Sequence, residues 1–203
     1  LDSTNDFVSL KNAYRRAKLI LSVSESTTKM IKNVFGSFSK KIFKINLSVG
    51  TVKLEDRLNK KNLITYMPRK LPTHSQKLLF MLKKKLLKTW SIKALDNIVN
   101  ENELYNILKK SKIFLSFSHM EGLGLPPLEA AKEGNKVIGY TGEGGKEYWK
   151  KPIFTEIPYG NLDLYLNEIL KCIKNEINYA EFKKQRKRIY KKYFTEAEHR
   201  CLK

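Results

Sequence analysis

Cysteine and histidine are scarce in this chain. Its 203 residues include two cysteines, Cys172 and Cys201, and three histidines. Neither residue type forms a pair at the spacing that metal ligands require. Both cysteines lie in polar, helix-like surroundings, so we expect reduced structural thiols of the kind found in cytosolic proteins. The sequence therefore predicts neither a redox role nor a metal site.

Long apolar runs are also missing. No stretch has the roughly 20 consecutive apolar residues that a membrane-spanning helix needs. The chain starts at Leu1 with a polar segment rather than a hydrophobic signal region, so we expect a cytoplasmic location. The apolar fraction of 41% is ample for a packed core. The length suits one large or two small domains.

Acidic residues are outnumbered, because 40 Lys and Arg against 20 Asp and Glu give a net charge of +20. Three explanations stay open. A Lys bias inherited from an AT-rich genome comes first, since the chain is also rich in Asn and Ile. Attraction to an anionic membrane comes second. Nucleic-acid binding comes third, because the excess is mostly Lys rather than Arg and no RNA-recognition, zinc-finger or helix-turn-helix pattern is present.

Strand-like and helix-like patterns alternate along the chain. Apolar runs predict strands at residues 19–23, 42–47, 63–66, 90–95, 112–116 and near Val137. Helical patterns appear at residues 5–18, 24–36, 75–89, 101–110, after Pro126, after Gly145, from Tyr159 and at residues 180–193. This alternation predicts an α/β fold with a parallel sheet covered by helices on both faces. Ligands bind such sheets beyond the carboxyl ends of the strands.

Residues 121–129, which we call the two-glutamate turn, read Glu-Gly-Leu-Gly-Leu-Pro-Pro-Leu-Glu. The prolines suit the first turn of a helix, so Glu121 is expected in a loop and Glu129 in the first helical turn. Gly122 and Gly124 would let a ligand approach the main-chain amides, and the carboxylates could accept hydrogen bonds from hydroxyls. The alternative is that Glu129 only complements the helix dipole and the glycines make an ordinary connection.

The two-glutamate turn resembles the E-x7-E signature of the retaining family 4 glycosyltransferases, also called glycosyl transferases group 1. Leu123 stands where an aromatic residue is common in that family. Segments similar to other family motifs occur in the family's order at residues 17–27, 41–50, 136–140 and 144–148, the last similar to its Gly-Gly-x-x-Glu turn. The resemblance therefore extends over most of the chain.

The resemblance implies the GT-B fold, which has two Rossmann-like domains. Residues 1–50 would be the end of the acceptor-side domain, residues 51–61 the linker, residues 62–175 the donor-binding domain and residues 176–203 a basic helical segment. A GT-B enzyme needs both halves, and only the end of the first half is recognisable here. We therefore expect this polypeptide to bind donor without substantial sugar transfer.

The resemblance also implies a reaction without a cofactor. A sugar would pass from a nucleotide-diphosphate sugar to a glycan or lipid-linked acceptor with retention of configuration, and a lipid-linked acceptor would place the enzyme at the inner face of a membrane. Glu121 would contact hydroxyls of the transferred sugar, and Glu129 would hold the ribose. The main-chain amides of Gly122, Leu123, Gly124 and Leu125 would line the sugar.

Two cations follow the strand that is predicted at residues 63–66. Arg69 and Lys70 resemble the family's Gly-Arg…Lys loop, whose cations hold the donor diphosphate, although Pro68 replaces the glycine and Lys77 competes with Lys70 for the role. Such cations would stabilise the charge of the departing diphosphate. Basic residues are so frequent in this chain that a solvated loop explains the same pattern.

The loop from Gly142 to Gly145 is the third candidate, because it follows a strand and opens a short helix, and Gly144 and Gly145 are its candidate binding residues. Its amides could bind phosphate or sugar, although glycines at such a turn are often only turn residues. His119 precedes the two-glutamate turn, but the resemblance assigns it no role. It is more simply a partly exposed loop residue.

Metal-binding carboxylates are not apparent, because no Asp-x-Asp pair is present. We therefore expect metal-independent chemistry that relies on Arg, Lys and amide groups. Two alternatives remain. One is another GT-B enzyme, such as a nucleotide-sugar epimerase or a phosphorylase. The other is a non-enzymatic module that binds nucleic acid or another polyanion.

Overall fold

The computed structural model describes residues 6–36, 41–49, 54, 59–96 and 100–193. Its main body is a five-stranded parallel sheet with the order β4-β3-β5-β6-β7. The strands are β3 (Lys61–Tyr66), β4 (Ser91–Ala94), β5 (Ser111–Glu121), β6 (Lys136–Glu143) and β7 (Phe154–Glu156). The prediction of an α/β fold with a parallel sheet is confirmed.

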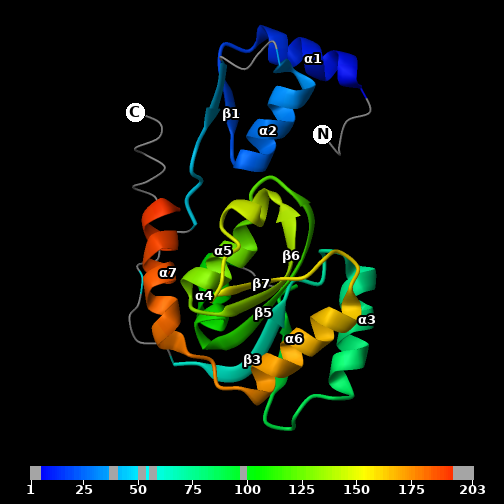
Figure 1. Ribbon diagram of the computed structural model, residues 1–203, viewed down its shortest axis with the longest axis vertical. Coiled ribbons are helices and arrows are strands. Elements are labelled where there is room, and N and C mark those ends of the chain that lie inside the picture. The colour runs from blue at the N-terminus through cyan, green and yellow to red at the C-terminus, as the bar shows by residue number, and fades with distance from the viewer. Residues whose placement is uncertain (1–5, 37–40, 50–53, 55–58, 97–99, 194–203) are drawn as a thin grey trace.

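Helices cover both faces of this sheet (Figure 1). One face packs against α4 (Glu101–Lys110), α5 (Leu125–Lys132) and α7 (Tyr179–Lys192), and the other against α3 (Pro72–Lys83) and α6 (Leu162–Lys174). Side chains alternate along β5. Phe114 packs into the core beneath α4, α5 and α7, whereas Ile113 and Leu115 pack into the core beneath α3 and α6. A strand buried on both faces explains the continuous apolar run in the sequence.

A smaller unit precedes the sheet. It comprises α1 (Phe7–Arg16), β1 (Ile20–Ser22), α2 (Glu25–Val34) and β2 (Ile42–Lys44), and β1 pairs with β2 in parallel. Ile20, Ile31 and Phe35 form its own core. Ser24 caps α2 by accepting a hydrogen bond from the Thr27 N–H, as its position predicts. Helix α2 contacts η2 (Gly144–Glu147), the short 3₁₀ helix that follows β6, so the unit lies at the carboxyl end of the sheet (Figure 1).

The sequence pattern misjudges two features of the sheet domain. The helix predicted at residues 75–89 ends earlier, because the chain turns twice, with the Lys85 N–H bonded to the Leu82 carbonyl and the Trp90 N–H bonded to the Leu87 carbonyl. Strand β7 was not predicted, since three residues are too few to show a period. The error in α3 lies away from the candidate site, whereas β7 ends with Glu156 at the carboxyl edge of the sheet.

Some predictions lie outside the described residues, including most of the linker at residues 51–61 and Cys201. Cys172, on α6, is a free thiol. In the part of the chain that the structure describes, no helix is both long and apolar enough to cross a membrane. The division into domains stays a prediction, and α7 packs Phe182 and Ile189 into the core of the sheet.

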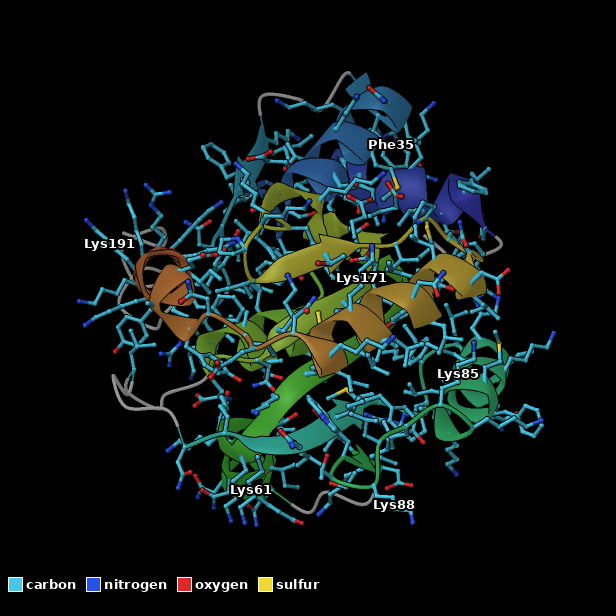
Figure 2. The ribbon with its side chains drawn as sticks, turned by 60° about the horizontal axis from the view of Figure 1, so that its bottom comes forward. Phe35, Lys61, Lys85, Lys88, Lys171 and Lys191 are labelled. Carbon is cyan, nitrogen blue, oxygen red and sulfur yellow. The ribbon has the colours of Figure 1, made fainter. Side chains whose placement is uncertain are left out.

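Lysine side chains point away from the core around the outline of the molecule in Figure 2. The exposed residues Lys61, Lys85, Lys88, Lys171 and Lys191 come from different segments of the chain, and in this view they lie at the lower left, the lower right, the middle and the left of the molecule. A nucleic-acid-binding domain usually gathers its cations on one face or along one helix. The dispersed pattern favours a general lysine bias for most of the charge.

The Glu147 carboxylate joins the smaller unit to the sheet domain. Its side chain is 3% exposed. It accepts hydrogen bonds from the Glu25 N–H at 2.7 Å, from Lys44 and Lys192 Nζ at 3.0 and 3.2 Å, and from the Tyr193 hydroxyl at 2.7 Å. Burial acts to raise the pKa of Glu147, but these four donors outweigh it and lower the pKa to about 2. One carboxylate thus connects α2, β2, η2 and the end of α7.

Glu147→Gln should lower the free energy of unfolding by about 2 kcal/mol at neutral pH, because the amide loses both ion pairs and leaves buried donors unsatisfied. The folded-state pKa is depressed, so the stabilisation is present above the unfolded pKa of 4.5 and is lost as the pH falls toward about 2. Urea unfolding at neutral pH and near pH 3 measures both effects.

The control for this comparison is Glu168→Gln, because Glu168 pairs only with the exposed Lys171 on its own helix among the residues described. Its effect on stability should stay within about 0.5 kcal/mol. An equal loss of unfolding free energy in the two variants would contradict the connecting role of Glu147.

Candidate active site

The two-glutamate turn lies at the carboxyl edge of the sheet, between β5 and α5. Strand β5 continues to Glu121, whose Cα pairs with that of Glu143 at the end of β6. The expectation that Glu121 lies in a loop is therefore wrong. Pairing with β6 resumes after an irregularity beyond Ser118 and extends the strand. Glu121 is thus the last residue of a paired strand.

Helix α5 begins without a side-chain cap. Gly124 precedes it with a φ of +80°, a conformation that suits glycine, and the Gly124 carbonyl accepts a hydrogen bond from the Tyr148 hydroxyl at 2.7 Å. Pro126 and Pro127 occupy the first turn, as predicted. Because proline has no N–H, only Leu125 among the first three helical residues offers one. Amide donors for a ligand are therefore confined to Leu125 and the glycine-containing segment before it.

Glu129 lies one turn later in α5 than expected. Helix α5 starts at Leu125, so Glu129 lies in its second turn rather than its first. Burial raises the pKa of Glu129 to about 7, Lys132 partly offsets this, and the Glu101 carboxylate adds to it. The helix dipole acts mainly within the first turn, so it does not account for this carboxylate. The helix-dipole alternative is thus weakened.

The loop after β3 reaches the two-glutamate turn. Lys70 Nζ donates to Glu121 Oε1 at 2.5 Å, and the two side chains are 44% and 20% exposed. Arg69 is exposed and makes no hydrogen bond or ion pair with another residue in the described ranges. Lys77, the alternative to Lys70, lies exposed on α3. The fold therefore brings Lys70 to Glu121.

The third loop packs directly on the two-glutamate turn. A Cβ atom at Gly144 would lie 2.2 Å from the Gly122 carbonyl oxygen and 2.5 Å from that of Glu121. A Cβ atom at Gly145 would lie 2.8 Å from Nε1 of Trp149. The contacts at Gly144 are with backbone atoms that cannot move aside, so this position requires glycine, whereas a side chain at Gly145 would force the Trp149 ring to shift. The loop supports the two-glutamate turn from the β6 side.

Sequence reasoning missed an aromatic cluster beside these loops. The His119 ring lies 4.9 Å from the Tyr159 ring, measured between centroids. Both residues line a cavity of about 300 Å³ at the ends of β5, β6 and β7. No local motif could have revealed it, because the sheet brings together residues that are distant in the sequence.

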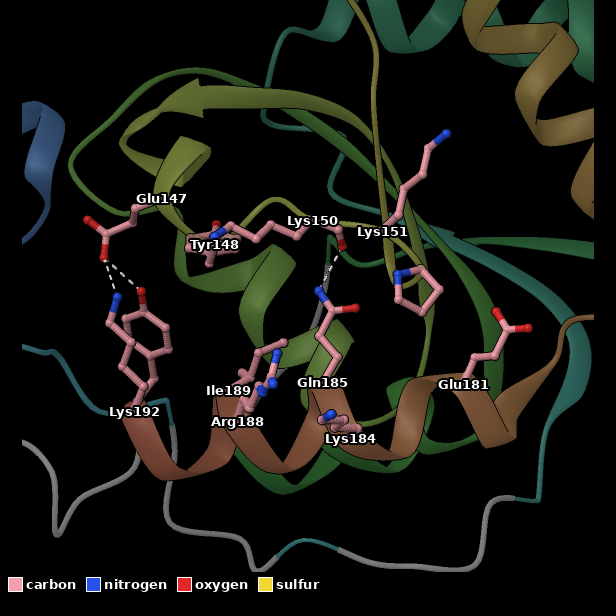
Figure 3. A pocket seen from close by; sticks show the side chains of 12 residues that line it. Glu147, Tyr148, Lys150, Lys151, Glu181, Lys184, Gln185, Arg188, Ile189 and Lys192 are labelled. Atoms are coloured by element: carbon pink, nitrogen blue, oxygen red, sulfur yellow. Dashed lines mark hydrogen bonds and ion pairs between the residues drawn. The ribbon is translucent and has the colours of Figure 1, made fainter.

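Larger cavities lie elsewhere. One of about 370 Å³ lies beside α7, where Lys150, Lys151, Lys184 and Arg188 are among the side chains around it (Figure 3). Another of about 460 Å³ lies between α6 and α7. None of the site residues predicted from the sequence lines either cavity. We place the candidate site at the carboxyl edge, because three predicted loops meet there and ligands bind such sheets at that edge.

One family model matches the chain. It describes the glycosyl transferases group 1 and matches residues 75–191. The matched region contains the two-glutamate turn and the third loop, and it begins after Arg69 and Lys70. No curated protein matches the chain.

Solved glycosyltransferase structures share its fold. A mutant of S. aureus TarM in complex with fondaparinux, α-GlcNAc-glycerol and UDP has a TM-score of 0.77 at 16% identity, over 96% of this chain and 45% of TarM. The pneumococcal O-GlcNAc transferase GtfA in complex with UDP and GlcNAc has a TM-score of 0.71 at 13% identity, over 95% of this chain and 45% of GtfA. Anabaena HepE in complex with UDP has a TM-score of 0.71 at 13% identity, over 94% of this chain and 64% of HepE.

These similarities confirm the expected GT-B fold. The chain spans about half the length of TarM and GtfA. At such low identities the likeness shows the fold alone.

Gly144→Ala should destabilise the protein by about 2 kcal/mol, because the new methyl group would meet backbone atoms that cannot rotate away. Gly36→Ala is the matched control, since a Cβ atom there meets nothing within 4 Å. Urea unfolding measures both variants. A Gly144→Ala protein as stable as the control would show that the third loop does not pack on the two-glutamate turn as described.

Proposed function

This chain belongs to the glycosyl transferases group 1, whose family model covers more than half of it, and from this membership we propose that it forms the donor-binding half of a retaining family 4 glycosyltransferase. The observation that carries the proposal is the contact between Lys70 and Glu121 at the carboxyl edge of the sheet. It joins a cation-bearing loop to the turn that resembles the family signature.

The proposed donor is a nucleotide-diphosphate sugar, and the proposed acceptor is a glycan or a lipid-linked sugar. Three similar structures, of TarM, GtfA and HepE, contain UDP. UDP is therefore the first nucleotide to test.

The proposed roles follow the positions of the three loops. Glu121 accepts hydrogen bonds from hydroxyls of the transferred sugar, and Glu129 accepts them from the ribose. Arg69 and Lys70 bind the diphosphate. Main-chain amides complete the site, from Gly122, Leu123, Gly124 and Leu125 on one side and from Gly144 and Gly145 on the other.

The Lys70–Glu121 ion pair suggests how the donor enters. Both side chains are partly exposed, so a diphosphate can replace the carboxylate as the partner of Lys70 at little cost. Glu121 is then released to accept hydrogen bonds from the sugar. As the bond between sugar and diphosphate breaks, Lys70 and Arg69 stabilise the charge that develops on the leaving group.

We propose that this chemistry needs no metal ion or cofactor, because Lys70, its neighbour Arg69 and the main-chain amides of the other two loops would stabilise the leaving group. In the described ranges, no three His, Cys, Asp or Glu side chains are placed to hold a metal ion. The metal dependence of donor binding is measured directly by adding EDTA.

Glu129→Gln should weaken UDP binding about tenfold near pH 8, because the amide accepts ribose hydrogen bonds less strongly than a carboxylate does. Calorimetric titration with UDP in EDTA measures the affinity. UDP binds the form in which Glu129 is ionised. The higher affinity of the wild type is therefore present above the pKa of Glu129, about 7, and is lost below it. The affinity ratio of wild type to variant should fall about tenfold between pH 8 and pH 6.

UDP itself titrates in this pH range, but this affects the affinities of both proteins equally and so does not change their ratio. A ratio that does not change with pH would contradict the role of Glu129. Tight RNA binding without UDP binding would favour the polyanion module instead.

We also propose that α7 holds the enzyme against the anionic inner face of a membrane, in the cytoplasm, where lipid-linked acceptors lie. Its buried side is formed by Phe182, Arg186 and Ile189. Apart from Ala180 and Glu181, its exposed residues are all basic, and they are Lys183, Lys184, Lys187, Arg188 and Lys191. This is the densest group of exposed cations on any described helix.

Replacing Lys183, Lys187 and Lys191 with Gln should weaken binding to vesicles containing phosphatidylglycerol about a hundredfold, at about 1 kcal/mol per lysine. These residues follow one another at i, i+4 and i+8 and share a helix face. The control replaces Lys61, Lys85 and Lys88, which removes the same charge elsewhere (Figure 2). Vesicle sedimentation measures the binding of both triple variants. An equal loss of vesicle binding in the two would contradict the α7 proposal.

A further inference from the structure

The cavity of about 300 Å³ at the ends of β5, β6 and β7 has no role in donor binding as proposed above. Ser118 and His119 line it from β5, Thr141 and Glu143 from β6, Glu156 from β7, and Tyr159 from the segment before α6. It thus opens at the carboxyl edge, where ligands bind in parallel sheets. Its mixture of aromatic and polar groups is typical of a small-ligand site.

An exposed aromatic ring forms one wall of this cavity. Tyr159 is 57% exposed. Its ring is flanked by those of His119, His74 and Tyr140, with centroids at 4.9, 5.1 and 5.2 Å. The hydroxyl of Tyr140 is hydrogen-bonded to Nδ1 of His74 at 3.1 Å, and this bond holds two of the neighbouring rings together. An exposed ring held by neighbours provides a preorganised apolar surface on which a flat ligand face can pack.

The charge at this cavity is opposite to that of the molecule. The chain has a net charge of +20, yet the cavity is lined by Glu143 and Glu156 and by a single cation, Lys146, which pairs with Glu143 at 2.8 Å. A phosphate or carboxylate ligand would be repelled by two carboxylates. Hydroxyl groups, in contrast, can donate to them. The lining therefore disfavours anionic ligands and suits a hydroxyl-rich one.

The backbone at Glu143 adds an independent observation. Glu143 has a φ of +63°, a conformation that is costly for a residue with a side chain and that tends to occur at functional sites. The preceding Gly142 packs beside Glu121, since a Cβ atom there would lie 2.9 Å from Cγ of Glu121. The cavity is therefore a direct neighbour of the carboxylate that is proposed to contact the transferred sugar.

We propose that this cavity binds one neutral sugar residue of the acceptor glycan, with its ring packed on Tyr159 and its hydroxyls donating to Glu143 and Glu156. The assignment to the acceptor rests on the proposed glycosyltransferase function. A sugar held here lies next to Glu121 and hence next to the transferred sugar. The cavity would then help to select acceptors by their ring shape and lack of charge.

The test is NMR titration of the isotope-labelled chain with N-acetylglucosamine, glucose and glucuronate, with UDP in a parallel titration. We expect the neutral sugars to shift the signals of His119, Thr141 and Tyr159, and glucuronate to bind at least about tenfold more weakly. Tyr159→Ala and, independently, Glu156→Gln should each weaken neutral-sugar binding about tenfold while UDP affinity stays unchanged.

The control is Phe80→Ala, which removes an aromatic ring that is 64% exposed on α3 and does not line the cavity. It should leave sugar binding unchanged. Neutral sugars that shift no cavity signal, or that bind Tyr159→Ala and Glu156→Gln as they bind the wild type, would overturn the inference. Sugar binding at the cavity without any UDP binding would support the sugar site and refute the donor-site proposal.

Discussion

The buried carboxylate of Glu147 is the contact on which the arrangement of the candidate site depends. It accepts hydrogen bonds from α2, from β2 and from the end of α7. The same short helix, η2, begins with Gly144, whose backbone lies against Glu121 and Gly122. Holding one end of η2 therefore holds its other end against the two-glutamate turn. The Thr27 hydroxyl adds a hydrogen bond from α2 to the Gly122 carbonyl at 3.2 Å. Scaffold and site are thus built from shared contacts.

Charge is distributed so that neighbouring parts of one edge suit different ligands. Arg69 and Lys70 are exposed cations on the loop that we propose binds the diphosphate, whereas Glu143 and Glu156 make the adjoining cavity acidic. Glu121 lies between these regions and is paired with Lys70. Under the proposed function, such a pattern would separate an anionic leaving group from neutral sugar rings. Most of the remaining lysines are dispersed over the surface and need no common ligand.

Features that depend on neighbouring residues could be predicted from the sequence. Helix α4 has the predicted bounds, and Pro126 and Pro127 occupy the first turn of α5 as expected. Features that depend on tertiary contacts could not. The length of β5 depends on pairing with β6, and the raised pKa of Glu129 depends on burial near α4. The four donors to Glu147 lie far from it in the sequence, so no local pattern could reveal their convergence.

The position of a bound nucleotide is the most direct test of the proposed donor site, and a crystal structure of this chain with UDP would measure it. We predict that the diphosphate lies against Lys70 and Arg69, that the Lys70–Glu121 ion pair is broken, and that Glu129 contacts the ribose. UDP bound instead in the cavity beside α7, with the Lys70–Glu121 pair intact, would contradict the assignment of the donor site to the carboxyl edge of the sheet.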